Sequence, residues 1–273
     1  MSGKIYVVGT PIGNLGDFSP RAAEILESVD FIAAEDTRVT AKLLNHFGIK
    51  KETVSYYEHN KNKKGAYLIN RVLAGENLAI VSDAGMPAIS DPGEDIVREA
   101  HGHGITVETV PGPSALTAAL SISGFPSGRF CFEGFLSVNK ISRKKHLEEI
   151  KNEKRTLIFY EAPHKLLKTL ADMRDILGER EICIVRELTK IHETVYRFDF
   201  SGAIEYFTEN APKGEFVLII KGKADAQLPQ MTFDDAVRLA RKLQAEGQSV
   251  SAAAKEAAAA SGLKKGEIYK ALI

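Results

Sequence analysis

Apolar and polar residues alternate along the N-terminal part of the chain in two distinct ways. Short, uninterrupted apolar runs are typical of buried strands, and they take turns with segments in which apolar residues recur every three or four positions, as on one face of a helix. The predicted strands are Ile5–Val8, Phe31–Ala34, Val54–Tyr57, Leu78–Ser82 and Thr106–Val110. The predicted helices lie near residues 20–28, 38–47, 65–74 and 93–101. Because strand and helix alternate throughout, the pattern predicts a largely parallel sheet in an α/β fold.

The pattern changes after a helix predicted at Ser114–Ile122. The later strands are predicted at Phe130–Phe135, Thr156–Tyr160, 182–187, 194–200 and 215–221. Helices are predicted among them only near 142–153 and 164–177. Since the last three strands follow one another without predicted helical crossovers, they predict a mixed sheet.

A short linker is predicted at Gln227–Pro229, and helices follow it at about 233–245, 250–260 and 266–272. A turn near Gly262 is followed by Lys264, Lys265 and Lys270, and these helices have a cadence like that of a helix-turn-helix. The chain is therefore expected to have three parts. These are an N-terminal α/β domain at 1–115, a second α/β domain with a mixed sheet at 116–225, and a helical module at 230–273.

Composition narrows the class of protein. Of the 273 residues, 44% are hydrophobic and 26% are charged, which is typical of a globular chain large enough for more than one domain. The 36 Lys and Arg balance the 36 Asp and Glu, so any nucleic-acid surface would have to be local. No apolar run approaches the roughly 18 residues needed to span a bilayer, and the first strand follows Met1 directly. We therefore expect a cytoplasmic protein.

Three loops rich in small residues follow predicted strands: Gly9–Asn14, Ser82–Gly93 and Pro111–Ala115. Parallel α/β sheets bind ligands beyond the carboxyl ends of their strands, and small residues let the backbone approach a ligand closely. Each loop alone could be a tight turn, but together they predict a site for a flat, nucleoside-like ligand. The dinucleotide and P-loop glycine signatures are absent from the sequence, and no metal-ligand spacing occurs, so no metal is expected.

Charged residues also cluster where predicted strands end, at 35–38, at 160–164 and at 186–190 with Glu193 following. Such residues cost desolvation free energy unless they are paired or functional, so each cluster indicates either a site or an ion-pair network between domains. The segment Tyr56–Asn60 could line a cleft or simply end a strand. Residues 139–155 hold seven Lys or Arg against three Glu, as on a solvated helix face or a flap that contacts phosphates.

Several motifs stand together in a specific order. They are V-G-T-P-I-G-N-L-G-D at 8–17, A-E-D-T-R at 34–38, S-D-A-G-M-P-A-I-S-D-P-G at 82–93, P-G-P-S-A at 111–115, F-E-G-F-L at 132–136 and R-E-L-T-K at 186–190. Over essentially its whole length the chain resembles the tetrapyrrole-methylase superfamily, and within it the bacterial branch of ribosomal RNA small subunit methyltransferase I. It departs from that pattern at Ser137, where a Pro is usual, and at Ala162 and Lys165, where Ser and Arg are usual.

The resemblance implies the two-domain class III methyltransferase architecture, with S-adenosylmethionine held between the two α/β domains of a homodimer. It implies 2′-O-methylation of a cytidine in the decoding region of 16S ribosomal RNA, with free RNA or the 30S subunit as the partner. The cofactor-binding residues that it implies are Pro11, Asp83, Ala84, Pro87, Ser114, Ala115, Tyr160 and Glu161.

Transfer of a methyl group to a ribose hydroxyl requires alignment of the reacting atoms, and a base that takes the hydroxyl proton would assist it. By residue type and position the candidates for this base are Glu35, Asp36, Glu161, Glu187 and Lys190. We favour the segment of Glu35 and Asp36 as catalytic, with Arg38 holding a phosphate.

Two other functions fit parts of the sequence. A methyltransferase of the same fold could act on a precorrin, a uroporphyrinogen or a protein residue. Alternatively, the α/β part could sense a small ligand for a nucleic-acid-binding regulator. The motifs at 34–38 and 186–190 and the C-terminal helices favour RNA as the substrate, and the strand-end loops favour an enzyme.

Overall fold

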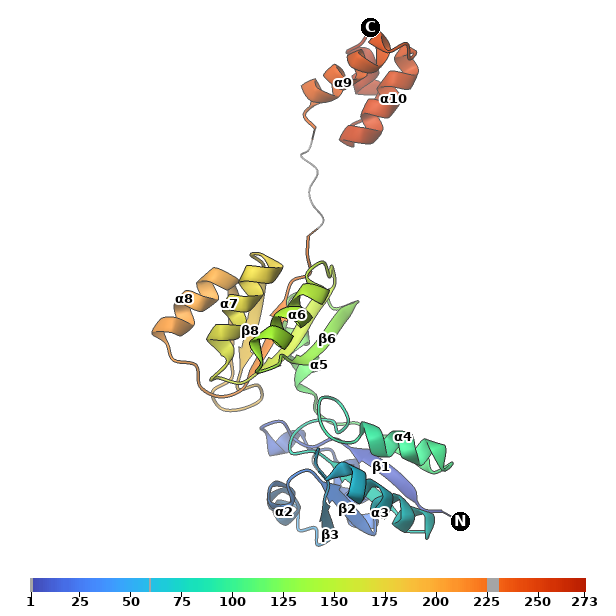
Figure 1. Ribbon diagram of the computed structural model, residues 1–273, viewed down its shortest axis with the longest axis vertical. Helices are drawn as coiled ribbons and strands as arrows, with labels where there is room; N and C mark the ends of the chain where they lie inside the picture. Colours follow the sequence, from blue (N-terminus) through green and yellow to red (C-terminus); the bar gives the residue numbers. More distant parts are fainter. Residues whose placement is uncertain (1, 59, 225–230) are drawn as a thin grey trace. The chain divides into compact units, whose positions relative to one another are not determined.

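The computed structural model describes residues 2–58, 60–224 and 231–273. Residues 1–223 form one compact unit that contains two sheets, and residues 224–273 form a second unit (Figure 1). The linker predicted at Gln227–Pro229 lies outside the described residues, as does His59 of the 56–60 segment.

The first sheet is entirely parallel, as its alternating pattern predicts. Its strands are β1 (Lys4–Val8), β2 (Phe31–Ala34), β3 (Glu52–Ser55), β4 (Leu78–Val81) and β5 (Thr106–Val110). They lie in the order β3-β2-β4-β1-β5. One face packs against α1 (Pro20–Ser28) and α2 (Thr37–His46), and the other packs against α3 (Lys61–Leu73) and α4 (Glu94–Gly102). We call this part, β1 to β5, the first lobe.

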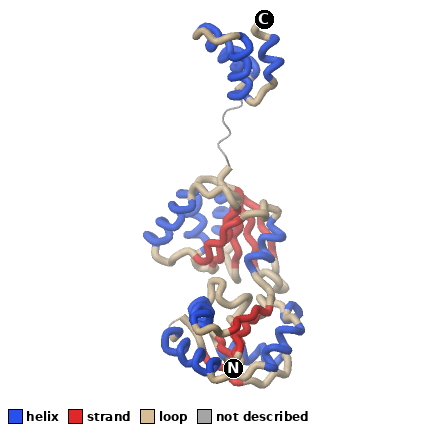
Figure 2. Tube along the Cα trace, turned by 90° about the vertical axis from the view of Figure 1, so that its right-hand side faces the viewer, coloured by secondary structure: helices blue, strands red, loops and turns tan. Residues whose placement is uncertain are grey.

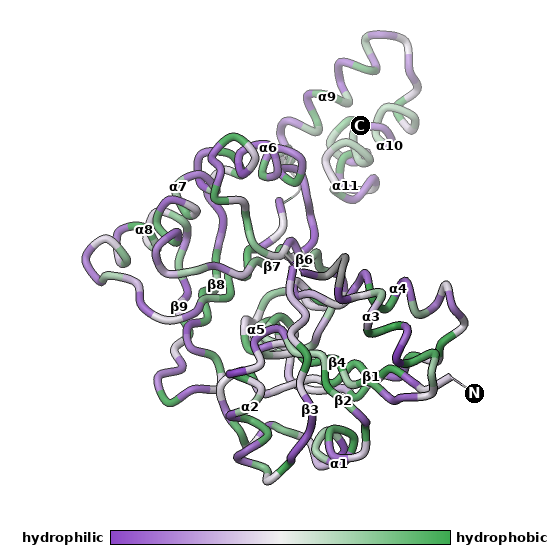
Figure 3. Tube along the Cα trace, turned by 60° about the horizontal axis from the view of Figure 1, so that its bottom comes forward, coloured by the Kyte–Doolittle hydropathy of each residue, from purple (hydrophilic) through white to green (hydrophobic). Residues whose placement is uncertain are grey.

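Burial explains why these strands could be recognised. Every residue of β2 and β4 is buried, because helices cover both faces of the sheet, so the strands are apolar throughout. Figure 3 shows β4 in green, whereas α4 changes between green and purple along its length. The third strand lies two residues earlier than expected and ends at Ser55. Beyond it, the Tyr57 amide donates a hydrogen bond to the side-chain oxygen of Asn60 at 2.9 Å instead of to a neighbouring strand. A short 3-10 helix, η1 (Leu15–Asp17), was not predicted.

The second sheet is mixed, which also confirms the expectation. It has the order β6-β7-β10-β8-β9, and only β6 and β7 pair in parallel. Its strands are β6 (Phe130–Phe135), β7 (Thr156–Glu161), β8 (Glu181–Arg186), β9 (Thr194–Asp199) and β10 (Phe216–Ile220). One face packs against α5 (Ala115–Ser123), and the other against α6 (Lys140–Ile150), α7 (Leu166–Leu177) and α8 (Phe200–Glu209). In Figure 2, blue helices flank the red strands of both sheets. We call this part, α5 to β10, the second lobe.

Helix α8 is a correction to the sequence analysis, which placed no helix between the strands that proved to be β9 and β10. The helix buries Phe200, Ala203 and Phe207, which lie on one face at helical spacing, and the Asp199 side chain caps it by accepting a hydrogen bond from the Gly202 amide. Its aromatic and β-branched residues and its glycine have modest helix propensity, so packing against the sheet decides its structure.

The second unit contains α9 (Phe233–Ala245), α10 (Val250–Ser261) and α11 (Lys265–Lys270). Its core is made largely of alanines, together with Leu243 and Ile268. Ser249 caps α10 and Thr232 caps α9 by accepting backbone hydrogen bonds. Within the described residues, none of the helices has the length and apolar character required to cross a membrane.

Candidate functional site

The three small-residue loops lie together at the carboxyl ends of β1, β4 and β5. The amides of Thr10 and Gly85 each donate to the other residue's carbonyl, at 2.9 and 3.1 Å. A Cβ atom added to Gly9 would lie 2.7 Å from the Cα of Gly112, so a side chain at this position would force the two loops apart. The glycines of the motifs therefore allow the loops to touch one another.

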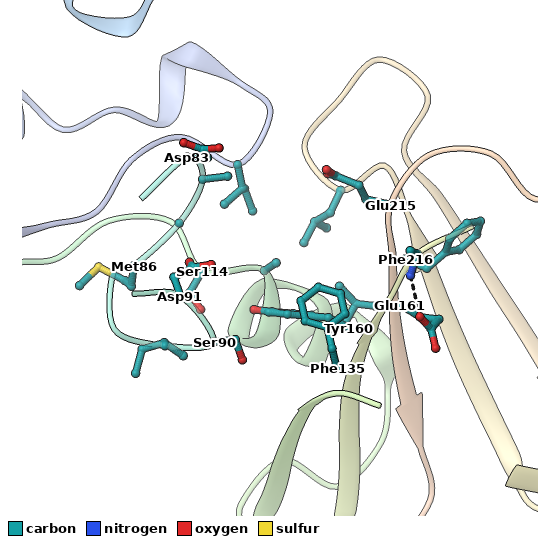
Figure 4. A pocket seen from close by; sticks show the side chains of 18 of the residues that line it. Asp83, Met86, Ser90, Asp91, Ser114, Phe135, Tyr160, Glu161, Glu215 and Phe216 are labelled. Atoms are coloured by element: carbon teal, nitrogen blue, oxygen red, sulfur yellow. Dashed lines mark hydrogen bonds between the residues drawn. The ribbon is translucent and has the colours of Figure 1, made fainter. Parts of the chain in front are cut away.

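Next to these loops is a cavity of about 510 Å³. This volume lies within the range of about 300 to 1,000 Å³ that is usual for small-molecule sites. The first lobe and the start of α5 contribute Ile12, Glu35, Asp83, Ala84, Gly85, Met86, Ile89, Ser90, Asp91, Ser114 and Ala115. The second lobe contributes Phe135, Tyr160, Glu161, Ala162, Pro163, Val185, Leu188, Glu215, Phe216 and Val217. Figure 4 shows Asp83, Met86 and Asp91 on one side and Tyr160, Phe135 and Phe216 on the other.

Three carboxyl groups on the first-lobe wall make the cavity electrostatically unusual. Burial, and then the charge of Glu35, raise the pKa of Asp91 to about 6, although a hydrogen bond with Ser82 opposes the shift. Burial and then the charge of Asp83 raise the pKa of Glu35, and burial raises the pKa of Asp83. No cation forms an ion pair with any of the three among the described residues. A positively charged ligand would therefore be favoured here.

The carboxyl groups of the acidic wall are not placed as the ligands of a metal ion. In the part of the chain that the structure describes, no group of three or more His, Cys, Asp or Glu residues is placed so that it could hold a metal ion.

Tyr160, on β7, contacts the start of α5 within the second lobe. Its hydroxyl accepts a hydrogen bond from the Leu116 amide at 3.0 Å, and burial raises its pKa. Its ring makes edge contacts with Phe132 and Phe135, at centroid distances of 5.0 and 5.5 Å. This arrangement holds the start of α5, with Ser114 and Ala115, against the cavity wall.

The Glu161 carboxylate is already occupied by groups of its own lobe. Its Oε1 lies 2.8 Å from Lys165 Nζ and accepts from the Ala162 amide at 2.8 Å, while Oε2 accepts from the Thr169 hydroxyl at 2.6 Å. The side chain is only 1% exposed. This buried ion pair stabilises the connection from β7 to α7 and leaves Glu161 poorly placed to accept a proton.

Of the three residues predicted to be catalytic, the structure places one at the cavity and two outside it. Glu35 lines the cavity, whereas Asp36 and Arg38 line neither this cavity nor its smaller neighbour. The Asp36 carboxylate caps α2 at the Arg38 amide and pairs with the Arg38 guanidinium at 2.6 Å, which lowers the pKa of Asp36 to about 2. Such a carboxylate is a weak base. The Arg38 side chain is 87% exposed.

The predicted cofactor residues fall into three groups. Asp83, Ala84, Ser114, Ala115, Tyr160 and Glu161 line the main cavity. Pro11 lines the neighbouring cavity of about 250 Å³ instead, and Pro87 is buried and lines neither.

Several lining residues were not singled out from the sequence, among them Met86, Asp91, Phe135 and Phe216. Asp91 and Phe135 belong to the motifs at 82–93 and 132–136, which were the only available signal. Phe216 begins a buried strand and carried no signal of its own.

The cluster at 186–190 forms an ion-pair network near the cavity. Lys190 Nζ lies 2.9 Å from both Glu187 Oε1 and Glu215 Oε2. Burial alone would raise the pKa of Glu187, but the Lys190 hydrogen bond and the Glu215 amide hold it below its ordinary value. A Cβ added to Gly13 would lie 2.6 Å from Lys190 Cγ, so this network packs directly against the loop of the first lobe. The cluster is thus structural as well as adjacent to the site.

The basic stretch at 139–155 is less basic in the fold than in the sequence. Arg143 is buried and pairs with Asp172 at 2.6 Å, Lys151 pairs with Glu148, and Arg155 pairs with Glu153. Lys140 and Lys145 are exposed on α6. Contact between this stretch and phosphates stays a prediction, and it would depend on the lysines that remain exposed.

Comparisons with known proteins agree with this geometry. The family model described as Tetrapyrrole (Corrin/Porphyrin) Methylases matches residues 4–203. The chain is 46% identical over 269 residues to "Ribosomal RNA small subunit methyltransferase I" of Synechocystis sp., which covers 98% of this chain and 96% of that protein. It is 48% identical over 221 residues to the protein of the same name from Thermotoga maritima, which covers 81% of this chain and 99% of the relative.

Solved structures show the same fold at lower identity. The methyltransferase CobJ matches with a TM-score of 0.63 and 18% identity, over 83% of this chain and 97% of that one. The match to the Thermotoga maritima relative leaves out about as many residues as the second unit contains. The family model ends at residue 203, within the first compact unit.

Proposed function

Since the chain belongs to the tetrapyrrole methylase family and is a methyltransferase, we propose that it transfers a methyl group from S-adenosylmethionine to ribosomal RNA of the small subunit. We further propose that the acceptor is the 2′-hydroxyl of a cytidine in the decoding region of 16S RNA. The name of relatives that are 46% and 48% identical supports RNA as the substrate. The observation that carries the cofactor assignment is the acidic cavity between the two lobes.

The cavity fits S-adenosylmethionine in size and in chemistry. Its aromatic side, with Phe135, Tyr160 and Phe216, suits a flat purine, and its acidic side, with Asp83 and Asp91, suits positive charge. When bound, the cofactor supplies an electrophilic methyl group on a positively charged sulfur atom. The residues at the start of α5, Ser114 and Ala115, offer backbone groups for its polar parts.

The protein must also align the acceptor hydroxyl and take its proton. Of the residues favoured as catalytic, Glu35 lines the cavity and has a raised pKa, whereas Asp36 is held by Arg38. We therefore assign Glu35, together with the adjacent Asp83, as the proton acceptor. The Asp83 amide donates a hydrogen bond to Glu35 Oε2 at 3.5 Å, and the charge of Asp83 adds to the burial that raises the pKa of Glu35.

The decisive experiment uses purified protein and S-adenosylmethionine labelled in its methyl group. Free 16S RNA and 30S subunits, both from cells that lack this activity, serve as separate acceptors, and nuclease digestion with mass spectrometry locates the label. Label on the ribose of a cytidine supports the proposal, and label on a base corrects the acceptor atom. Cofactor binding without transfer to either RNA would contradict it and favour a tetrapyrrole or protein acceptor.

The second unit is proposed to add affinity for RNA. It carries Arg238, Arg241, Lys264 and Lys265 on exposed positions of a three-helix module. The homodimer implied by the resemblance and the cytoplasmic location expected from the sequence remain proposals. Analytical ultracentrifugation of the purified protein would test the homodimer, and cell fractionation would test the location.

A further inference from the structure

A second, smaller cavity of about 250 Å³ lies beside the proposed cofactor site. The loop that follows β1, the first turns of α2 and the end of β4 form its walls. Of the residues that line it, only Pro11, predicted to bind the cofactor, and Asp83, on the acidic wall, have a role in the function proposed so far.

The two cavities meet at one residue. Among the described residues, Asp83 alone lines both of them. Its Oδ1 accepts a hydrogen bond from the Asp36 amide at 3.0 Å, so the backbone at the start of α2 fixes the position of this carboxylate. Methyl transfer requires the acceptor oxygen and the methyl carbon to approach within about 3 to 3.5 Å in line. The acceptor must therefore reach the cofactor cavity at such a junction.

The small cavity has the size and the walls for a single aromatic ring. Its volume is below the usual range of about 300 to 1,000 Å³ for whole cofactor-sized ligands. Pro11 and Leu43 line it, and Leu15 and Val39 remain 43% and 37% exposed at its rim. Exposed apolar side chains that line a small cavity favour contact with the flat face of a ring.

Positive charge lies beside this small cavity, which we call the slot. Arg38 and Lys42 are one helical turn apart on α2, and both are exposed. Lys42 has no ion-pair partner among the described residues, and the exposed guanidinium of Arg38 is held in place by Asp36. A ring with an adjacent phosphate, which is the chemistry of a nucleotide, complements this arrangement.

We infer that the small cavity is the subsite for the base of the nucleotide whose ribose is methylated. The base enters between Leu15 and Val39, its phosphate lies toward Arg38 and Lys42, and its 2′-hydroxyl reaches the junction at Asp83. This inference rests on the proposed function, because it requires RNA as the substrate. It adds a base-binding site to the cofactor cavity.

The test combines two substitutions in the slot with a change in the RNA. Leu15→Ser and Val39→Ser remove apolar wall, and Leu73→Ser, at a leucine that is 41% exposed on α3, is the matched control. The acceptor RNA is prepared both intact and with an abasic target nucleotide that keeps its 2′-hydroxyl. The kcat/KM for each RNA, the Kd for S-adenosylmethionine and the unfolding midpoint are measured for every protein.

On intact RNA, we expect the slot variants to lose about tenfold or more in kcat/KM. Their cofactor Kd and unfolding midpoint should match those of the control. On abasic RNA, the slot variants and the unsubstituted protein should become nearly equal, because the ring that the slot holds is missing. If the variants lose the same factor on both RNAs, the slot does not bind the base and the inference is overturned. If the unsubstituted protein methylates no intact RNA, the proposed function fails first and the inference fails with it.

Discussion

Carboxylates follow strands in both lobes, but their surroundings differ. Glu161 and Glu187 of the second lobe each lie within 2.9 Å of a lysine, and the pair of Glu161 with Lys165 is buried. Glu35, Asp83 and Asp91 of the first lobe have raised pKa values and no cationic partner among the described residues. A paired and buried carboxylate cannot be removed without leaving an uncompensated charge on its partner. An unpaired carboxyl group with a raised pKa instead favours the binding of a cationic ligand. The two second-lobe carboxylates therefore belong to structural ion pairs, whereas the three first-lobe carboxyl groups are available to a ligand in the cavity.

Breaking a second-lobe pair should have the largest effect, and the effect should be on stability. Glu161→Gln would leave Lys165 without its counter-ion at a buried position, and we expect a loss of about 3 kcal/mol in the free energy of unfolding. Urea denaturation would measure it. Glu108→Gln, which breaks the exposed pair with Lys4, is the control and should cost much less stability, because solvent screens the exposed pair. Equal losses in the two variants would remove the distinction between buried and exposed pairs.

Removing a first-lobe carboxylate should instead affect the chemical step. Glu35→Gln is expected to lower the single-turnover rate with bound cofactor by about 100-fold, because an amide cannot take the hydroxyl proton. The unfolding midpoint should not fall, since Glu35 has no cationic partner among the described residues. Asp36→Asn is the neighbouring control, and its rate should change much less. A full rate in Glu35→Gln would show that this carboxyl group is not the base.

The raised pKa of Asp91 predicts how cofactor affinity changes with pH. In the free protein the folded state favours protonated Asp91, so stability falls as the pH rises from the ordinary value of 3.8 to about 6. A cationic ligand favours the ionised form, so cofactor binding should tighten as the pH rises through about 6. Glu35, Asp83 and Tyr160 face the same cavity, and only the two carboxyl groups among them would add to the trend.

Isothermal titration calorimetry can measure this change in affinity. We expect the Kd for S-adenosylmethionine to be about tenfold lower at neutral pH than at about pH 5. Asp91→Asn should show a flatter profile over the same interval. A profile that is unchanged by this substitution would assign the pH dependence to the other carboxyl groups.

The smallest effect on chemistry is expected from removal of the second unit. A chain that ends at Lys223 retains the whole of the first compact unit and has about the length of the match to the Thermotoga maritima relative. Its cofactor Kd should be unchanged, whereas its RNA affinity should fall severalfold and depend less steeply on salt, since exposed Lys and Arg are lost. Filter binding at several salt concentrations would measure both. An unchanged salt slope would exclude RNA contact by α9 to α11.

Much of the fold was visible in the sequence because it depends on neighbouring residues. The four apolar residues of β4 and the helical spacing in α9 are local features, and the structure agrees with the strand and the helix predicted from them. The start of α1 is local too, since Ser19 accepts a hydrogen bond from the Ala22 amide and Pro20 is the first helical residue. Helix α8 was missed because its propensity is modest and its burial against the second sheet comes from residues distant in the chain. The expected boundaries at 1–115, 116–225 and 230–273 remain predictions.

For the site, the sequence by itself determined the family motifs, the family and the loops that carry the glycines and carboxylates. Only the tertiary structure showed that Glu35 lies beside Asp83 and Asp91, that the carboxylate of Asp36 is held by Arg38, and that Glu161 is held by Lys165 and Thr169. The physical reason is that ionisation and hydrogen bonding depend on burial and on charges within a few ångströms. Those neighbours come from strands and loops that are far apart in the chain, so spacing along the sequence cannot tell a paired carboxylate from an unpaired one.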